Sequence, residues 1–84
     1  MTLSFAERAW EEYCEWQRQD ARTIKRINAL LKDVCRNPFE GVGKPEPLRH
    51  ELAGWWSRRI DDEHRLVYRV VGDVVEIRQC RHHY

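Results

Sequence analysis

The order of hydrophobic and polar residues predicts two amphipathic helices in the first half of the chain. The first spans about residues 7–19, where hydrophobic residues recur at helical spacing at Ala6, Ala9, Trp10, Tyr13 and Cys14. Glu12 falls with the other charged residues on the solvent side of this helix. The second spans residues 21–36, with Asp20 as its N-cap, and Asn37-Pro38 ends it. Its inner face comprises Ile24, Ile27, Leu30, Leu31, Val34 and Cys35.

Short strands are predicted on both sides of this helical pair. Residues 3–6 form one strand, and alternating patterns predict others over about 54–60, 65–71 and 74–81. Residues 37–47 contain three prolines and two glycines, too many helix and strand breakers for either element, and are predicted as a structured loop. The fold class is therefore α+β, one domain over residues 1–84 with two N-terminal helices packed on a twisted antiparallel sheet, in the order β-α-α-β-β-β.

The hairpin turn at Gly72-Asp73 sets the register of the last two strands. It places Tyr68 beside Ile77 on the face that covers the helices, and Arg69 beside Glu76 on the other face. A loop of odd length, such as residues 62–64, then places Arg59 and Arg65 together on the open face, with Trp55 also exposed there.

Strict alternation in the last strand would point charged residues into the core. A β-bulge near Arg78-Gln79 removes this conflict, because one extra residue turns Cys80 inward. The same bulge would bring Arg81 and His83 to the face of Arg59 and Arg65.

Charge and cysteine content exclude several classes of protein. Fifteen Lys and Arg against fourteen Asp and Glu give a net charge of +1, so the overall field does not indicate a nucleic-acid binder. Seven of the eight Lys and Arg residues after position 43 are arginine, which still allows a local phosphate-binding cleft. Three cysteines without C-x-x-C spacing disfavour a disulfide framework and a thiolate metal site. No apolar run approaches ~20 residues, so a cytoplasmic protein is expected.

The second half contains the groups needed to cut RNA without a metal ion or other cofactor. Glu46 would take the proton of a 2′-hydroxyl, Arg59 and Arg65 would stabilise the charge on the phosphoryl oxygens, and His83 would protonate the 5′-oxygen. Tyr84 could stack on a base.

Each of these groups also has a simpler interpretation. Glu46 could be a solvated loop charge, and Arg58, Arg59 and Arg65 could form ordinary surface ion pairs with Asp61, Asp62 and Glu63. His50 and His64 are predicted to be surface residues. A zinc site at Cys80, His82 and His83 is disfavoured, because three ligands within four strand residues make a weak pattern.

Two segments of this second half resemble a known family. Residues 39–70, FEGVGKPEPLRHELAGWWSRRIDDEHRLVYRV, and the final CRHHY are similar to the YoeB toxins of the RelE/ParE superfamily. The resemblance implies the RelE/ParE-like fold and a toxin of a bacterial type II toxin-antitoxin system, an endoribonuclease that cuts mRNA in the ribosomal A site. It implies a YefM/Phd-type antitoxin, the 70S ribosome and mRNA as partners. A homodimer is a further candidate assembly.

The resemblance also implies roles for individual residues. Glu46 is the general base, Arg65 the phosphate stabiliser, His83 the general acid and Tyr84 a supporting catalytic residue. The residues expected to contact RNA or the ribosome are Lys44, Arg49, Arg59 and Arg81. Two positions depart from the family, Arg49, where lysine is frequent, and His82, where tyrosine is common. The alternative is a non-catalytic toxin of the same fold that poisons DNA gyrase, or a regulatory binding module.

Overall fold

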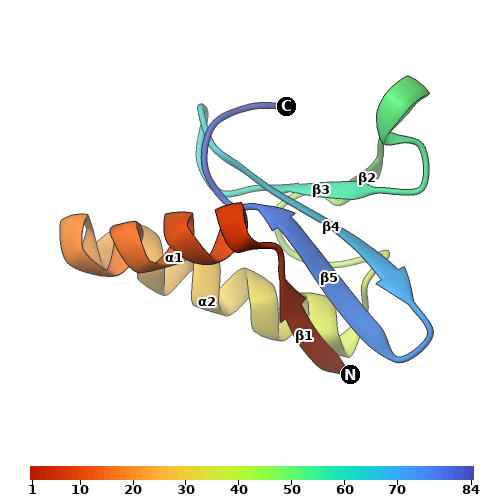
Figure 1. Ribbon diagram of the computed structural model, residues 1–84, viewed down its shortest axis with the longest axis horizontal. Helices are drawn as coiled ribbons and strands as arrows, with labels where there is room; N and C mark the ends of the chain where they lie inside the picture. Colours follow the sequence, from red (N-terminus) through yellow and green to blue (C-terminus); the bar gives the residue numbers. More distant parts are fainter.

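Two helices lie against one face of a five-stranded sheet in the computed structural model, which describes residues 1–84 (Figure 1). The spatial order of the strands is β1-β5-β4-β3-β2. In chain order the elements are β1 (Thr2–Phe5), α1 (Glu7–Gln19), α2 (Ala21–Arg36), β2 (Glu46–Pro47), a 3₁₀ turn (His50–Leu52), β3 (Trp56–Arg59), β4 (Arg65–Val71) and β5 (Val74–Gln79).

The predicted fold class is confirmed, with one correction to the sheet. Strands β2 to β5 pair antiparallel, but β1 pairs in parallel with β5, from Thr2 opposite Val74 to Phe5 opposite Ile77. The sheet is therefore mixed rather than wholly antiparallel. Hydrophobic alternation carries no information on strand direction, and it missed β2 because a two-residue strand between prolines has no periodicity.

Helix α2 matches its predicted bounds, and the Asp20 carboxylate accepts hydrogen bonds from the backbone N–H groups of Arg22 and Thr23. The prediction for α1 is wrong in one respect, because Trp10 is 52% exposed whereas Glu12 is buried. Glu12 faces inward because its carboxylate accepts the backbone N–H of Cys80 at 2.9 Å and pairs with Arg8. The buried side of α1 comprises Ala9, Glu12 and Trp16.

The predicted β4–β5 register is confirmed, with Tyr68 opposite Ile77 and Arg69 opposite Glu76. The predicted bulge is also present, because Val67 pairs with Gln79 and Arg78 has no partner on β4. Strand β5 ends at Gln79, two residues earlier than predicted. The β3–β4 loop comprises residues 60–64 rather than three residues, but its odd length keeps the predicted phase, and Arg59 lies opposite Arg65.

Cys80 is fully buried behind the bulge, and its sulfur contacts the Ala9 carbonyl oxygen at 3.6 Å. Burial raises the pKa of this thiol to about 12. Because the thiolate is the reactive form, Cys80 is expected to resist alkylation in the folded protein at pH 8. Mass spectrometry after maleimide treatment should find adducts only on the half-buried Cys14 and Cys35, with a third adduct appearing in denaturant.

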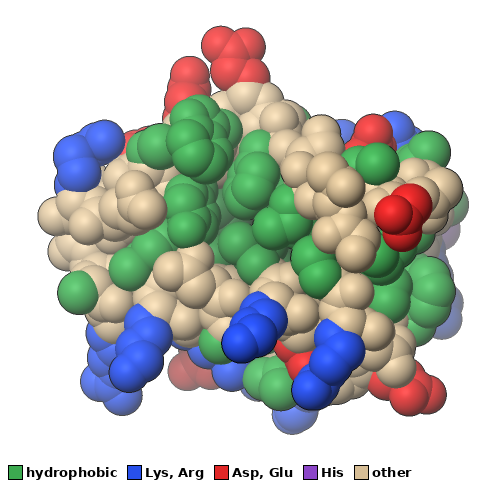
Figure 2. Space-filling view, turned by 90° about the horizontal axis from the view of Figure 1, so that it is seen from below, with side chains coloured by type: hydrophobic (Ala, Val, Ile, Leu, Met, Phe, Trp, Pro, Cys, Tyr) green, Lys and Arg blue, Asp and Glu red, His purple; other side chains and the backbone are tan.

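An apolar groove remains open between β1 and the two helices. It has a volume of about 640 Å³ and is lined by Leu3, Phe5, Trp10, Tyr13, Leu31 and Cys35 among others. The space-filling view from below shows hydrophobic side chains gathered in a hollow with Lys and Arg side chains along one border (Figure 2). Neither helix has the length and apolar character needed to span a bilayer.

Candidate active site

The sheet face away from the helices carries three of the predicted site residues, Glu46, Arg59 and Arg65. Glu46 on β2 lies opposite Ser57 on β3, and Ser57 lies opposite Val67 on β4. Arg59, two residues after Ser57, lies opposite Arg65. Paired residues of antiparallel strands and every second residue along a strand share one face. Glu46 therefore lies on the same side of the sheet as both guanidinium groups.

The C-terminal residues fold back over this face after β5 ends (Figure 1). The Gln79 amide donates to the carbonyl oxygens of Arg81 and His82, at 3.1 and 3.4 Å. The backbone N–H of Arg65 donates to the His82 carbonyl oxygen at 3.0 Å, and that of His82 donates to Nδ1 of His64 at 2.7 Å. His82 adopts a left-handed conformation, with φ of 66°, at this turn of the chain. The tail is thus tied to β4 and β5 rather than frayed.

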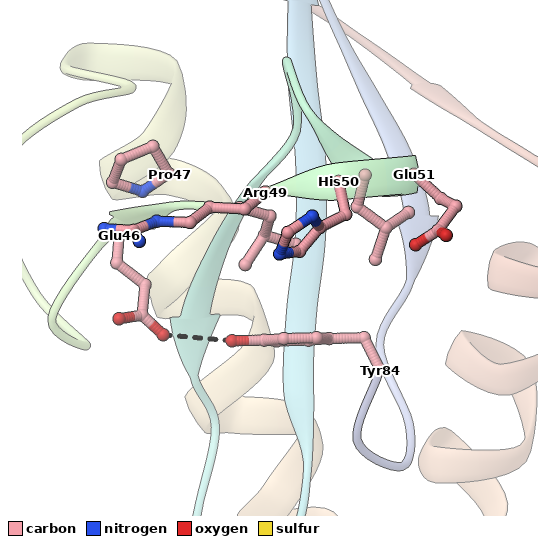
Figure 3. A pocket seen from close by; sticks show the side chains of 8 residues that line it. Glu46, Pro47, Arg49, His50, Glu51 and Tyr84 are labelled. Carbon is pink, nitrogen blue, oxygen red and sulfur yellow. Dashed lines mark hydrogen bonds between the residues drawn. The ribbon is translucent and has the colours of Figure 1, made fainter.

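Tyr84, the last residue, reaches Glu46, and His83 lies beside it. The Tyr84 hydroxyl donates to Oε1 of Glu46 at 3.0 Å (Figure 3). The His83 ring stacks on the Tyr84 ring with centroids 4.6 Å apart. Glu46, Arg49 and Tyr84 line one cavity of about 430 Å³, together with Pro47, Leu48, His50, Glu51 and Leu52. No hydrogen bond or ion pair joins Glu46 to His83, or either of them to Arg65.

Three buried donor atoms on this face have no hydrogen-bond partner, Nε of Arg59, Nε of Arg65 and Oγ of Ser57. Unsatisfied buried donors are rare, and each is unfavourable by ~1–3 kcal/mol. Two of them belong to guanidinium groups, whose planar fork matches the oxygens of a phosphate. Arg59 and Arg65 therefore have donors that form no hydrogen bond within the folded chain, and a guanidinium donates to anions such as phosphate.

The loop before Glu46 is held by a buried arginine. Arg58 is fully buried and donates to the Asp33 carboxylate, the Tyr68 hydroxyl and loop carbonyl oxygens. The simpler interpretation, in which Arg58 pairs at the surface with residues 61–63, is therefore wrong for this residue. Hydrogen bonding from the Val42 backbone N–H and from Arg58 holds the pKa of Asp33 below its usual value, so this carboxylate stays ionised at neutral pH. Burial raises the pKa of Tyr68, which keeps its hydroxyl protonated.

Several predicted placements differ from the structure. Arg81 does not join Arg59 and Arg65, because its guanidinium lies 4.2 Å from the Trp16 ring centroid and donates to Gln19 on α1. Trp55 is not bare, because Arg69 and Arg78 stack on it. Lys44 is exposed on the loop before β2, with φ of 52°.

Two residues that sequence reasoning did not select also support the tail. The side chain of His64, predicted to be a surface residue, is only 12% exposed and packs edge-on against Trp16. Gln79 is buried and bonds to two carbonyl oxygens of the tail. No sequence signal identifies either role, because both partners are backbone groups of the irregular tail.

A metal centre could use only one cluster of side chains, Glu63, His64 and His82, whose donor atoms lie within 4.8 Å of one another. Nδ1 of His64 already accepts the backbone N–H of His82, so Nε2 carries the proton of the neutral ring and faces Glu63 at 3.3 Å. A metal ion bound to Nε2 of His64 would require the ring proton to move to Nδ1. Nδ1 could then no longer accept the backbone N–H of His82, and this bond to the tail would break. The cluster is therefore not arranged in advance for metal binding.

Comparison with known proteins identifies what the chain is similar to. Residues 5–84 match the family model described as YoeB-like toxin of bacterial type II toxin-antitoxin system. Toxin YoeB of Escherichia coli K12 is 56% identical over the full length of both chains. The YoeB/ParE toxin of Agrobacterium tumefaciens superimposes with a TM-score of 0.97, at 51% identity over both whole chains. YoeB in the heterotetrameric YoeB-YefM complex of Staphylococcus aureus superimposes with a TM-score of 0.92 at 45% identity, over 100% of this chain and 98% of that one.

Proposed function

The chain belongs to the YoeB-like toxin family of bacterial type II toxin-antitoxin systems, and we propose that it is an endoribonuclease that cleaves mRNA in the ribosomal A site without a metal ion. One observation carries the proposal. The hydrogen bond between the Tyr84 hydroxyl and Glu46 places the C-terminal residues over the sheet face that holds Arg59 and Arg65. Glu46 and Tyr84 line one cavity, Arg59 and Arg65 lie on the same sheet face as Glu46, and the His83 ring stacks on Tyr84.

The proposed reaction is a transfer within the RNA backbone. Glu46 takes the proton of a 2′-hydroxyl, and that oxygen attacks the adjacent phosphorus. Arg65, assisted by Arg59, stabilises the negative charge that develops on the phosphoryl oxygens through its guanidinium group. His83 protonates the 5′-oxygen as its bond to phosphorus breaks. The products are a 2′,3′-cyclic phosphate and a 5′-hydroxyl.

Docking on the ribosome would not require a strongly basic protein. A free ribonuclease collects RNA through its own field, whereas a factor bound between walls of ribosomal RNA needs only local positive groups. Lys44 and Arg49 lie exposed on either side of Glu46 in the sequence and are the proposed contacts there. Arg81 remains a candidate contact on the α1 side of the tail, where it lies over Trp16.

We also propose an antitoxin partner of the YefM type. The Staphylococcus aureus relative forms a complex with YefM. The open apolar groove beside β1, with Trp10 half exposed, supports a protein partner, since exposed apolar patches mark interaction sites. Co-purification with the product of the adjacent reading frame tests this part, and a chain that is harmless when produced alone would contradict it.

A direct test of the activity adds the purified protein to ribosomes carrying a defined message. The expected result is cleavage within the A-site codon, with 5′ ends that a kinase labels without prior phosphatase treatment. A 2′-deoxy substitution at the nucleotide 5′ of the cut should block the reaction, because the attacking hydroxyl is then missing. An uncut message together with inhibited DNA supercoiling by gyrase would favour the non-catalytic alternative.

A further inference from the structure

A second cluster of side chains lies on the open sheet face, outside the candidate active site. The Arg69 guanidinium carbon lies 4.5 Å from the Trp55 ring centroid, and that of Arg78 lies 5.3 Å from it. Arg69 also pairs with Glu76 at 2.5 Å, whereas Arg78 is exposed and has no carboxylate partner. We call Trp55, Arg69 and Arg78 the Trp55 cluster. It combines an aromatic plane with a free positive charge.

The strand register places this cluster next to the candidate active site. Trp55 precedes Ser57 by two residues, and Ser57 lies opposite Glu46. Arg69 follows Val67 by two residues on β4, so it extends the same row of the sheet as Trp55. Residues two apart on a strand are about 7 Å apart on one face. The order along the face is therefore the Arg59–Arg65 pair, then Glu46 with Tyr84, then the Trp55 cluster.

The bulge at β5 is what makes the cluster possible. In a regular strand, Arg78 and Gln79 would point to opposite faces, so one of them would face the helices. The extra residue in β5 lets both side chains lie on the open face. Gln79 then supports the tail, and Arg78 reaches Trp55. One irregularity in β5 thus serves the candidate active site and its neighbour, as bulges beside active sites commonly do.

We propose that the Trp55 cluster is a second RNA subsite, which binds the nucleotide adjoining the cleaved bond when a single strand lies across the open face. This inference rests on the proposed function. The indole supplies a stacking surface for a base, and the unpaired Arg78 binds a phosphate of the same strand. Arg69, held by Glu76, supports the indole.

The arrangement of groups on the open face favours RNA over an acidic peptide as the occupant. An acidic peptide would complement the arginines. It would not explain why an aromatic ring lies in the same row as Arg59 and Arg65, because its acidic side chains do not stack on an indole. A nucleic-acid strand repeats a phosphate and a flat base at every step, which matches the guanidinium groups of Arg59 and Arg65 and, further along the face, the indole of Trp55 with Arg78. A peptide partner remains an outcome that the experiment can detect.

The test measures RNA binding in a His83→Gln background, so that the probe is not cut. A fluorescein-labelled single-stranded RNA of about twelve nucleotides is titrated by anisotropy at several salt concentrations. Trp55→Leu and Arg78→Ala are each expected to weaken binding by about tenfold. Arg78→Ala should also reduce the slope of log K against log salt by about 0.7, the value for one phosphate contact on a single strand. Arg18→Ala, which removes an exposed arginine from α1, is the matched control and should change neither the affinity nor the location of binding.

The same substitutions are then made with His83 intact and assayed on ribosomes carrying a message. The subsite is supported if either variant needs a higher protein concentration than the wild type for half-maximal cleavage and reaches the same maximal rate. This readout also serves if binding to free RNA is too weak to titrate. Loss of RNA binding in both variants supports the subsite. If the wild-type protein cuts no message, that result overturns the proposed catalysis but not the subsite. Normal RNA affinity and normal cleavage in both variants would overturn the subsite and leave the catalysis standing. Normal cleavage with lost neutralisation by the antitoxin would overturn it in favour of a protein interface.

Discussion

Replacing Glu46 or His83 by glutamine is expected to lower the rate of message cleavage on the ribosome by about 10²- to 10⁴-fold. Glutamine keeps the size of the glutamate side chain but cannot take a proton, and in place of His83 it cannot supply one. Both side chains are exposed in the free protein, so neither substitution removes core packing. The measurement is a single-turnover cleavage rate on ribosomes programmed with a defined message.

The cavity beside Tyr84 supplies matched controls for this prediction. Glu51 and His50 line the same cavity as Glu46 but have no proposed role, so Glu51→Gln and His50→Gln should cleave at close to the normal rate. Circular dichroism of all four variants checks that they are folded. A normal rate in either glutamine variant would contradict the role of that residue.

Local signals predicted most of the scaffold. Helix α2 has a cap, an unbroken apolar stripe and a proline after its end, and its bounds match the structure. The Gly72-Asp73 turn fixes the β4–β5 register, and the conflict between alternation and burial in β5 was enough to predict the bulge. In each case the deciding residues lie within one element or one turn.

Long-range contacts decided the rest. Glu12 is buried because it accepts the backbone N–H of Cys80, 68 residues away, and no pattern within α1 can show that partner. Arg81 turns to α1 because Trp16 offers an aromatic surface there. The sequence predicted correctly that Arg59 and Arg65 share a face, yet the contact between Tyr84 and Glu46 depends on how the tail turns at His82, whose conformation alternation does not specify.

Arg58 is the most constrained charged group in the molecule, and it connects the scaffold to the candidate site. All five of its N–H donors are used, Nε by the Tyr68 hydroxyl, Nη1 by Asp33 and the Val42 carbonyl oxygen, and Nη2 by the carbonyl oxygens of Asn37 and Glu40. Tyr68 in turn donates to the Pro38 carbonyl oxygen at 2.6 Å. The loop over residues 37–42 is therefore folded around one guanidinium before the chain enters β2 at Glu46.

Arg58→Met is expected to lower the free energy of unfolding by about 3–5 kcal/mol, because it removes the buried charge partner of the Asp33 carboxylate and leaves three loop carbonyl oxygens without their donor. Chemical denaturation monitored by tryptophan fluorescence measures this loss. The matched control is Arg36→Met, because Arg36 pairs with the same carboxylate but is 83% exposed, and exposed pairs contribute only about 0–1 kcal/mol.

Lysine cannot replace Arg58, since its three donors on one nitrogen cannot reach acceptors arranged around a planar fork, so Arg58→Lys should also be destabilised.

Tyr68→Phe removes one acceptor and one donor from the same network and leaves the fold intact, so it tests the effect on the site where Arg58→Met is too unstable to assay. We expect it to slow message cleavage, because the loop that leads to Glu46 loses the hydrogen bond that its Pro38 carbonyl oxygen accepts from Tyr68. Tyr13→Phe removes a hydroxyl bonded to Asn28 on the helices and should not slow cleavage. Equal unfolding midpoints for Arg58→Met and Arg36→Met would show that the buried guanidinium does not hold the loop, and the position of Glu46 would then need another cause.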